Sequence, residues 1–166
     1  MKLGNIFSRR NRILLRELIV TDFKLRYQGS VLGYLWSILK PLFLFVILYL
    51  VFDKFLKFGR DIDHFPVYLL LGTVLWSFFT EATTQGLNSI VSRGDLIRKI
   101  SFPKYIIVIS GTVSALINLG INMSIVIIAC IANGVVLDDS ALLIIPLILE
   151  LYAFALGIAF FLAAIN

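Results

Sequence analysis

The chain has 166 residues, of which 60% are hydrophobic and 15% are charged, and its mean hydropathy is +0.97. One core of this size cannot bury so much apolar surface, so the composition excludes an ordinary soluble domain. About twenty consecutive apolar residues span the hydrocarbon of a bilayer as a helix, and the chain has four long apolar stretches. Because these stretches do not alternate, they predict an all-α, polytopic transmembrane helical bundle rather than a β-barrel.

Residues 1–30 precede the first stretch and form a basic segment that we expect to be cytoplasmic. Its central part reads as a partly amphipathic helix, with an apolar stripe made of Leu14, Leu18 and Leu25. A helix of this kind can lie in the headgroup layer with its arginines near anionic lipid. The segment is therefore predicted to be an interfacial helix, and the alternative is a solvated basic tail.

The first apolar stretch, Val31–Phe52, opens the transmembrane domain that we assign to residues 31–166. Tyr34 and Trp36 stand near its start, where amphipathic rings are enriched at membrane interfaces. Together with Lys40 they are this stretch's candidates for the translocation path. Lys40 lies within the stretch and must either snorkel to the headgroups or face a protected, wet interior. Both interpretations stay open: an anchor, or a contact to an anionic substrate or partner.

The second stretch, Phe65–Phe79, contains Trp76 and then turns polar. If the helix continues to about residue 91, its second half carries a polar stripe that must face protein or a water-lined path. The candidates for that translocation path in this stretch are Trp76, Phe79, Glu81 and Asn88.

The third stretch, Tyr105–Val136, is rich in small residues, and close helix packing explains most of them. Asn118 and Asn122 stand one turn apart and are better candidates for an interhelical hydrogen bond or a pore surface. The chain's single cysteine, Cys130, has no partner for an intramolecular disulfide and reads as an apolar filler.

The fourth stretch, Ala141–Ile165, contains Glu150, an intramembrane acid that is a functional candidate by its position. The stretch runs to the end of the sequence without a Lys or Arg anchor beyond it. This ending leads us to expect a shortened chain or a gene fragment.

Lys and Arg residues are distributed unevenly between the two sides of these stretches. With a cytoplasmic N-terminus, 11 of the 15 lie in the inside segments, and 3 lie in the outside loops. The positive-inside rule predicts this orientation, and it explains the basic charge without nucleic-acid binding. We therefore expect a multi-pass protein of a bacterial cytoplasmic membrane.

Motifs for catalysis are missing from the sequence. It has no phosphate loop of the form G-x-x-x-x-G-K-[ST], and its one histidine, His64, has no interpretable nucleophile arrangement around it. No pair of carboxylates stands at catalytic spacing, and no metal-ligand spacing surrounds the cysteine. We expect a protein that is not an enzyme and holds neither a metal nor another cofactor.

Three motifs together resemble a known family. Residues 26–36 (RYQGSVLGYLW) with 39–42 (LKPL), then Gly72 with Trp76 and Phe79, and then residues 96–104 (LIRKISFPK) are similar to signatures of ABC-2 type permeases that export polysaccharides, such as O-antigen, capsule, teichoic acid and rhamnan-type glycans.

The resemblance implies a permease that forms a homodimer and pairs with separate ABC ATP-binding subunits, so that ATP and Mg²⁺ would bind to the partner. It also implies that lipid-linked polysaccharide passes between the two permease copies. The cytoplasmic segment 92–104 would then be the coupling segment that docks on the ATPase, through Leu96, Ile97, Arg98, Lys99, Phe102 and Pro103. Apolar knobs with flanking charges suit such an interface. Members of the family usually have six spans, so the four here would be the first four.

The resulting hypothesis is the membrane-spanning permease subunit of an ATP-driven exporter of lipid-linked polysaccharide. The alternative is a small multi-span membrane scaffold or interaction protein whose polar stripes only pack helices. A lipid-modifying membrane enzyme would need an acid/base constellation that the sequence does not offer.

Overall fold

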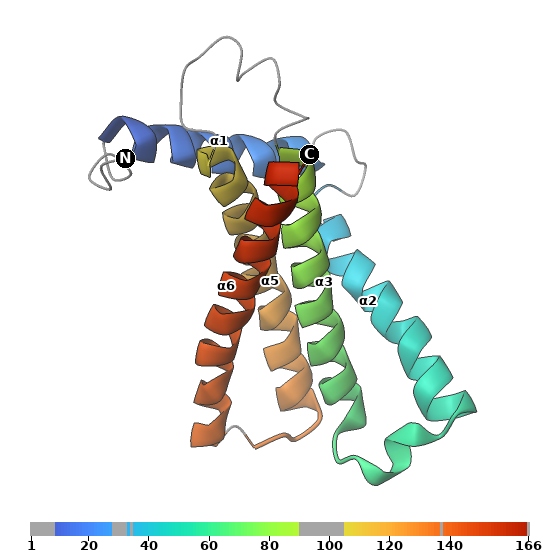
Figure 1. The fold of residues 1–166 in the computed structure, drawn as a ribbon. Helices are drawn as coiled ribbons and strands as arrows, with labels where there is room; N and C mark the ends of the chain where they lie inside the picture. The colour runs from blue at the N-terminus through green and yellow to red at the C-terminus, as the bar shows by residue number, and fades with distance from the viewer. Residues whose placement is uncertain (1–8, 28–32, 34, 90–104, 137, 166) are drawn as a thin grey trace.

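The computed structural model describes residues 9–27, 33, 35–89, 105–136 and 138–165. Three long helices stand side by side, a fourth diverges from them towards one end, and a fifth lies across the opposite end (Figure 1). In chain order the elements are α1 (Arg9–Tyr27), α2 (Leu35–Tyr49), η2 (Leu50–Phe55), η3 (Phe58–Asp61), α3 (Phe65–Ser89), α5 (Tyr105–Ala132), η5 (Asp139–Leu143) and α6 (Ile144–Ile165).

Four segments are long and apolar enough to cross a membrane: Leu35–Phe55, Phe65–Gly86, Tyr105–Ala132 and Ala141–Ile165. The described residues form helices and the turns between them, which confirms the predicted all-α bundle with four spans. As expected, α3 continues through the polar sequence that follows Phe79.

Two helix ends differ from the predicted bounds. The first span was expected from Val31, but α2 begins at Leu35, because Gly33 before it adopts a φ of +48°, which does not fit a right-handed helix. The third was expected to reach Val136, but α5 ends at Ala132 and the chain turns at Gly134, with a φ of +67°.

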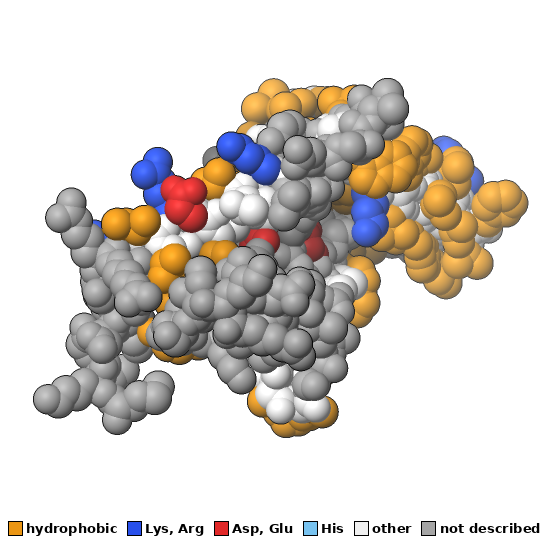
Figure 2. Space-filling model, turned by 90° about the horizontal axis from the view of Figure 1, so that it is seen from above, with side chains coloured by type: hydrophobic (Ala, Val, Ile, Leu, Met, Phe, Trp, Pro, Cys, Tyr) orange, Lys and Arg blue, Asp and Glu red, His pale blue; other side chains and the backbone are white. Residues whose placement is uncertain are grey.

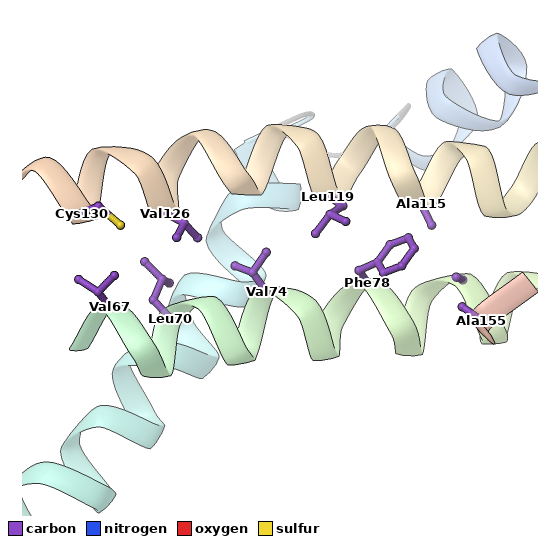
Figure 3. Close-up of a cluster of buried hydrophobic side chains, with 10 residues drawn as sticks. Val67, Leu70, Val74, Phe78, Ala115, Leu119, Val126, Cys130 and Ala155 are labelled. Atoms are coloured by element: carbon purple, nitrogen blue, oxygen red, sulfur yellow. The ribbon is translucent and has the colours of Figure 1, made fainter. Parts of the chain in front are cut away.

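The core lies mainly between α3 and α5 (Figure 3). Val67, Leu70, Val74 and Phe78 point from α3 towards α5 at helical spacing, and Cys130 is buried in the same cluster. The surface that faces away from this core is also apolar, as expected for helices whose solvent is lipid. Cys130 therefore acts as the apolar filler that the sequence predicted.

The contact between α3 and α6 is close, because small residues meet there. Ala155, Ala159 and Ala163 recur every four residues on α6 and are buried. Gly86 of α3 faces Ala159, because an added Cβ would meet the Cβ of Ala159 and lie 2.5 Å from its Cα. Small side chains let the two backbones approach as they do in many membrane bundles.

The helix α1 confirms that the segment before the first span is helical, and it lies across the ends of the spans (Figure 1). Leu14 and Leu18 are half-buried, whereas Arg12 and Arg16 are exposed. Seen from this end, Lys and Arg side chains stand beside apolar ones (Figure 2). This mixture suits a helix at an interface between lipid and water.

Candidate functional site

A cleft of about 490 Å³ opens between α2, α3 and α5. Most of the described residues that the sequence predicted for a translocation path line it: Trp36, Lys40, Trp76, Glu81, Asn118 and Asn122. A volume of this size falls within the range of about 300–1,000 Å³ that is typical of ligand sites. The structure thus gathers side chains from three separate spans around one space.

Helical spacing explains why these side chains meet. Glu81 and Gln85 are four residues apart on α3, and Asn118 and Asn122 are four apart on α5, so each pair occupies one helix face. The second pair faces the first because α3 and α5 also pack through the apolar core beneath. Lys40 enters from the first two turns of α2.

Glu81 is the centre of a hydrogen-bond network in this cleft. Its Oε2 accepts a 2.7 Å bond from Nδ2 of Asn118, and its Oε1 accepts a 3.1 Å bond from Nε2 of Gln85. The first of these bonds joins α5 to α3, which is one of the two roles predicted for the asparagine. The network gives the carboxylate polar partners inside an apolar bundle, where an unpaired charge would be costly.

Asn122 lies deeper, with an exposed fraction of 5%. Its Nδ2 donates to the backbone oxygen of Asn118 at 2.9 Å and to that of Ser37 at 3.5 Å, so it connects α5 to α2. Its Oδ1 is buried and accepts no hydrogen bond among the described residues. Because backbone oxygens can only accept, these bonds identify which atom of the amide is the donor.

Lys40 and Trp36 stand on the α2 side of the cleft and are exposed. Within the described part of the chain, no acidic side chain forms an ion pair with Lys40. Both interpretations of this lysine remain compatible with its position.

Phe79 and Glu150 do not join the cleft. They line a groove of about 510 Å³ between α3 and α6, together with Phe154, whose ring stacks on that of Phe79 at a centroid distance of 5.8 Å. Trp76 stands between the two spaces and borders both. The structure thus places Phe79 next to Trp76 but outside the cleft that Glu81 lines.

Several predicted residues lie outside the part that the structure describes. They are Tyr34, the side chain of Asn88, and the whole proposed coupling set of Leu96, Ile97, Arg98, Lys99, Phe102 and Pro103.

One polar contact between α1 and α5 was not predicted from the sequence. Asp22 of α1 accepts a 3.3 Å hydrogen bond from Oγ of Ser110, which is fully buried near the start of α5 and shares its one hydrogen with the backbone oxygen of Ile107 at 2.8 Å. Asp22 lies four residues after Leu18 on the half-buried face of α1, so helical periodicity could have placed it towards the bundle. The bond fastens α1 to the span that follows the proposed coupling segment.

Metal ligands do not gather in the described residues: no group of three or more His, Cys, Asp or Glu side chains there could hold an ion. The polar groups of the cleft are instead amides, one carboxylate, hydroxyls and one ammonium, beside two indole rings. Such a set forms hydrogen bonds and stacking contacts with organic groups.

Comparison with known proteins agrees with this architecture. The family described as ABC-2 type transporter matches residues 13–166. The O-antigen export system permease protein RfbA of Myxococcus xanthus is 30% identical over 155 residues, which cover 93% of this chain and 59% of that protein. The RfbA permease of Klebsiella pneumoniae is 35% identical over 89 residues, 54% of this chain and 34% of its own length.

The chain therefore spans between about a third and three fifths of these curated relatives. The family match, in contrast, covers almost all of its residues and includes every described helix that could cross a membrane. The chain is a membrane protein that belongs to the ABC-2 type transporter family.

Proposed function

We propose that this chain belongs to the membrane-spanning permease subunit of an ATP-driven exporter. This subunit moves lipid-linked polysaccharide across a bacterial cytoplasmic membrane. The observation that carries the proposal is the family match over residues 13–166, joined to relatives named as O-antigen export permeases. The polar cleft between α2, α3 and α5 supports it, because polar side chains from three spans gather there around one space. These observations favour the permease over the scaffold alternative.

ATP hydrolysis is assigned to a separate ABC ATP-binding subunit, because the chain has no phosphate loop of its own. The docking surface on this chain is the segment 92–104, which precedes α5 directly. A motion of the ATPase would then reach α5 first, and α1 with it through Asp22 and Ser110.

A second copy of the permease completes the proposed assembly. Only 6% of the residues in the apolar windows of Leu35–Phe55 and of Ala141–Ile165 are buried, whereas 39% are buried in the window of Phe65–Gly86. The outer faces of α2 and α6 are thus available to lipid or to another subunit. A path between two copies would border the side of α2 that carries Trp36 and Lys40.

The ATPase assignment is tested by co-purification with a candidate ATP-binding subunit from the same host. Arg98, Lys99 and Phe102 are changed together to alanine, and we expect recovery of the ATPase with the permease to fall at least about tenfold. The matched control changes Lys54, Phe55 and Lys57, two cations and a phenylalanine at the other end of the bundle.

Unchanged recovery after the first triple substitution, or an equal loss after the control, would refute the docking assignment. Either result would leave the family membership untouched, because that membership does not depend on which loop contacts the ATPase.

Orientation is tested by thiol labelling of intact cells in a Cys130→Ala background. We expect Phe58→Cys, in the loop between α2 and α3, to react with a membrane-impermeant maleimide added outside. Lys24→Cys, on the exposed side of α1, should react only after the cells are opened. Labelling in the reverse order would place the coupling segment outside the cell and contradict the exporter proposal.

A further inference from the structure

Glu150 carries an acidic group inside a membrane span, where its carboxylate is exposed on α6. Within the described part of the chain, no hydrogen bond or ion pair reaches this carboxylate. Glu81, in contrast, has amide donors from Asn118 and Gln85. Because an ionised carboxylate among lipid tails is costly, acids in membrane spans usually pair with another group. A partner for Glu150 is therefore expected from outside the described residues.

Three aromatic rings line the same groove of about 510 Å³ as this carboxylate. The ring centroids of Trp76 and Phe79 are 5.9 Å apart, and those of Phe79 and Phe154 are 5.8 Å apart, so the three rings form one continuous surface. Trp76 and Phe154 are 64% and 61% exposed, which leaves ring surface for a ligand. The faces of aromatic rings attract ammonium groups, as a carboxylate does, and both repel an anion. The lining of the groove thus favours a cation.

The groove lies where α3 and α6 move apart and is open on its outer side. Gly86 and Ala159 hold the two helices so close that an added Cβ has no space, whereas an added Cβ at Gly72 has nothing within 4 Å. The remaining lining is apolar and consists of Leu75, Leu147 and Leu151. A molecule dissolved in the lipid can therefore enter the groove from the side and rest an alkyl chain on this lining.

The depth of Glu150 restricts how the cation is carried. It lies six residues after Ile144, where α6 begins at the end of the bundle opposite α1, or about 9 Å along the helix axis (Figure 1). Side chains on a helix lean towards its N-terminus, so the carboxylate extends towards the head groups at that end. An ammonium attached directly to an alkyl chain reaches this depth with its chain among lipid tails. In a phospholipid, the phosphate stands between the chain and the ammonium, and it would be repelled by the carboxylate.

A second copy of the chain does not offer a described cation at this depth. Lys40 lies within the first two turns of α2, near the end of the bundle where α1 lies. Lys54 lies 3.2 Å from the carboxylate of Asp53 in its own copy. A small amphiphile dissolved in the lipid therefore fits the groove better than a second copy does.

We propose that the groove between α3 and α6 is a binding site for amphiphilic amines, molecules that carry an ammonium group on an alkyl chain. The carboxylate of Glu150 and the ring of Trp76 hold the ammonium, and the alkyl chain rests on the apolar lining. The site lies outside the polar cleft that Glu81 lines. The proposal goes beyond the proposed function and does not depend on it.

The test measures binding of tritiated dodecyltrimethylammonium to the full chain in nanodiscs, and binding to empty nanodiscs is subtracted. The nanodisc lipid is digalactosyl diacylglycerol, which is uncharged and has no amine of its own. Two competitors are compared: the unlabelled cation and 2,2-dimethyltetradecane. The second has the same shape as the cation, with a carbon atom in place of the charged nitrogen, so the comparison isolates the effect of the charge.

We expect saturable binding, and we expect the neutral competitor to be at least about tenfold weaker than the unlabelled cation. Glu150→Gln should weaken binding of the cation at least about tenfold, because it removes the charge and keeps the shape of the side chain. Glu17→Gln is the matched control, since it removes the same charge from the exposed side of α1. Phe154→Leu should weaken binding about threefold. Its control is Phe161→Leu, at a ring of the same helix that is 65% exposed and does not line the groove.

Equal competition by the two molecules would overturn the proposal, because the groove would then accept any alkyl chain. A Glu150→Gln protein that binds the cation as tightly as the Glu17→Gln protein would overturn it as well. Absence of saturable binding to the native chain would also refute it, and would leave the carboxylate to a proton or to a cation on another span. If Glu150→Gln fails to fold, the two competitors on the native chain decide alone. Because no ATPase is present, a failure of the proposed export function would not alter any of these results.

Discussion

Gly86 is the position where the packing of α3 against α6 is least tolerant. A Cβ there would meet the Cβ of Ala159, and would lie 2.5 Å from the Cα and 3.0 Å from the oxygen of that residue. Because two of these atoms belong to the backbone, a change of side-chain rotamer cannot relieve the clash. Gly86→Ala should therefore separate the two helices, and overpacking of this kind costs about 1–3 kcal/mol.

Gly72 provides the matched control because it lies in the same helix and has nothing within 4 Å of an added Cβ. Gly72→Ala should be neutral or stabilise α3 by up to about 1 kcal/mol through helix propensity. The two substitutions are thus expected to differ by about 1–4 kcal/mol in the free energy of unfolding. The assay is unfolding in mixed micelles by increasing sodium dodecyl sulfate, followed by circular dichroism.

A further substitution sharpens the test. Ala159→Gly removes the Cβ that Gly86→Ala would meet, but the Cα and the oxygen of residue 159 remain. We therefore expect the protein that carries both Gly86→Ala and Ala159→Gly to stay destabilised. If Gly86→Ala unfolds at the same detergent fraction as Gly72→Ala, the close approach of α3 and α6 is wrong.

Two other contacts give separate predictions. A double-mutant cycle of Glu81→Ala and Asn118→Ala, in the same unfolding assay, should give a coupling energy of about 0.6–2 kcal/mol for their 2.7 Å hydrogen bond, and a value of zero would contradict that bond. Asp22→Ala should speed amide hydrogen exchange in α1 about fivefold, because it breaks the contact to Ser110, whereas Glu17→Ala, on the exposed side of the same helix, should leave exchange unchanged. Equal exchange in both variants would show that the contact does not hold α1 in place.

The existence of the four spans could be predicted because hydrocarbon admits only long apolar helices or closed barrels. The predicted ends of the spans were less accurate where a helix ends inside a stretch that is still apolar. Asn133 and Gly134 are a recognisable stop, since the amide of the first bonds the oxygen of Ala129 and the second takes a positive φ. The apolar Val135 and Val136 after them concealed it.

In the candidate site, too, some placements could be predicted from the sequence and others could not. Glu81 and Asn118 could be predicted to face protein, because lipid excludes polar groups from the outer faces of a bundle. The direction of Phe79 could not be predicted, since an aromatic ring is stable against lipid, a groove or another helix. Its placement on Phe154 depends on how α6 is rotated against α3, a long-range property that no local pattern carries. The contact of Asp22 with Ser110, 88 residues apart, is long-range in the same sense.

The divergence of α2 from its neighbours has a mechanical consequence. Its beginning is held by the contact from Asn122 to Ser37. Towards its other end α2 lies away from the other spans (Figure 1), and Leu48 and Tyr68 line a groove of about 370 Å³ there. A rod of 21 residues, about 31 Å long, that is clamped at one end works as a lever. A tilt of roughly 10° about the clamp would move the far end through about 5 Å, the pitch of one helical turn. A displacement too small to disturb the clamp would thus be amplified at the opposite face of the membrane.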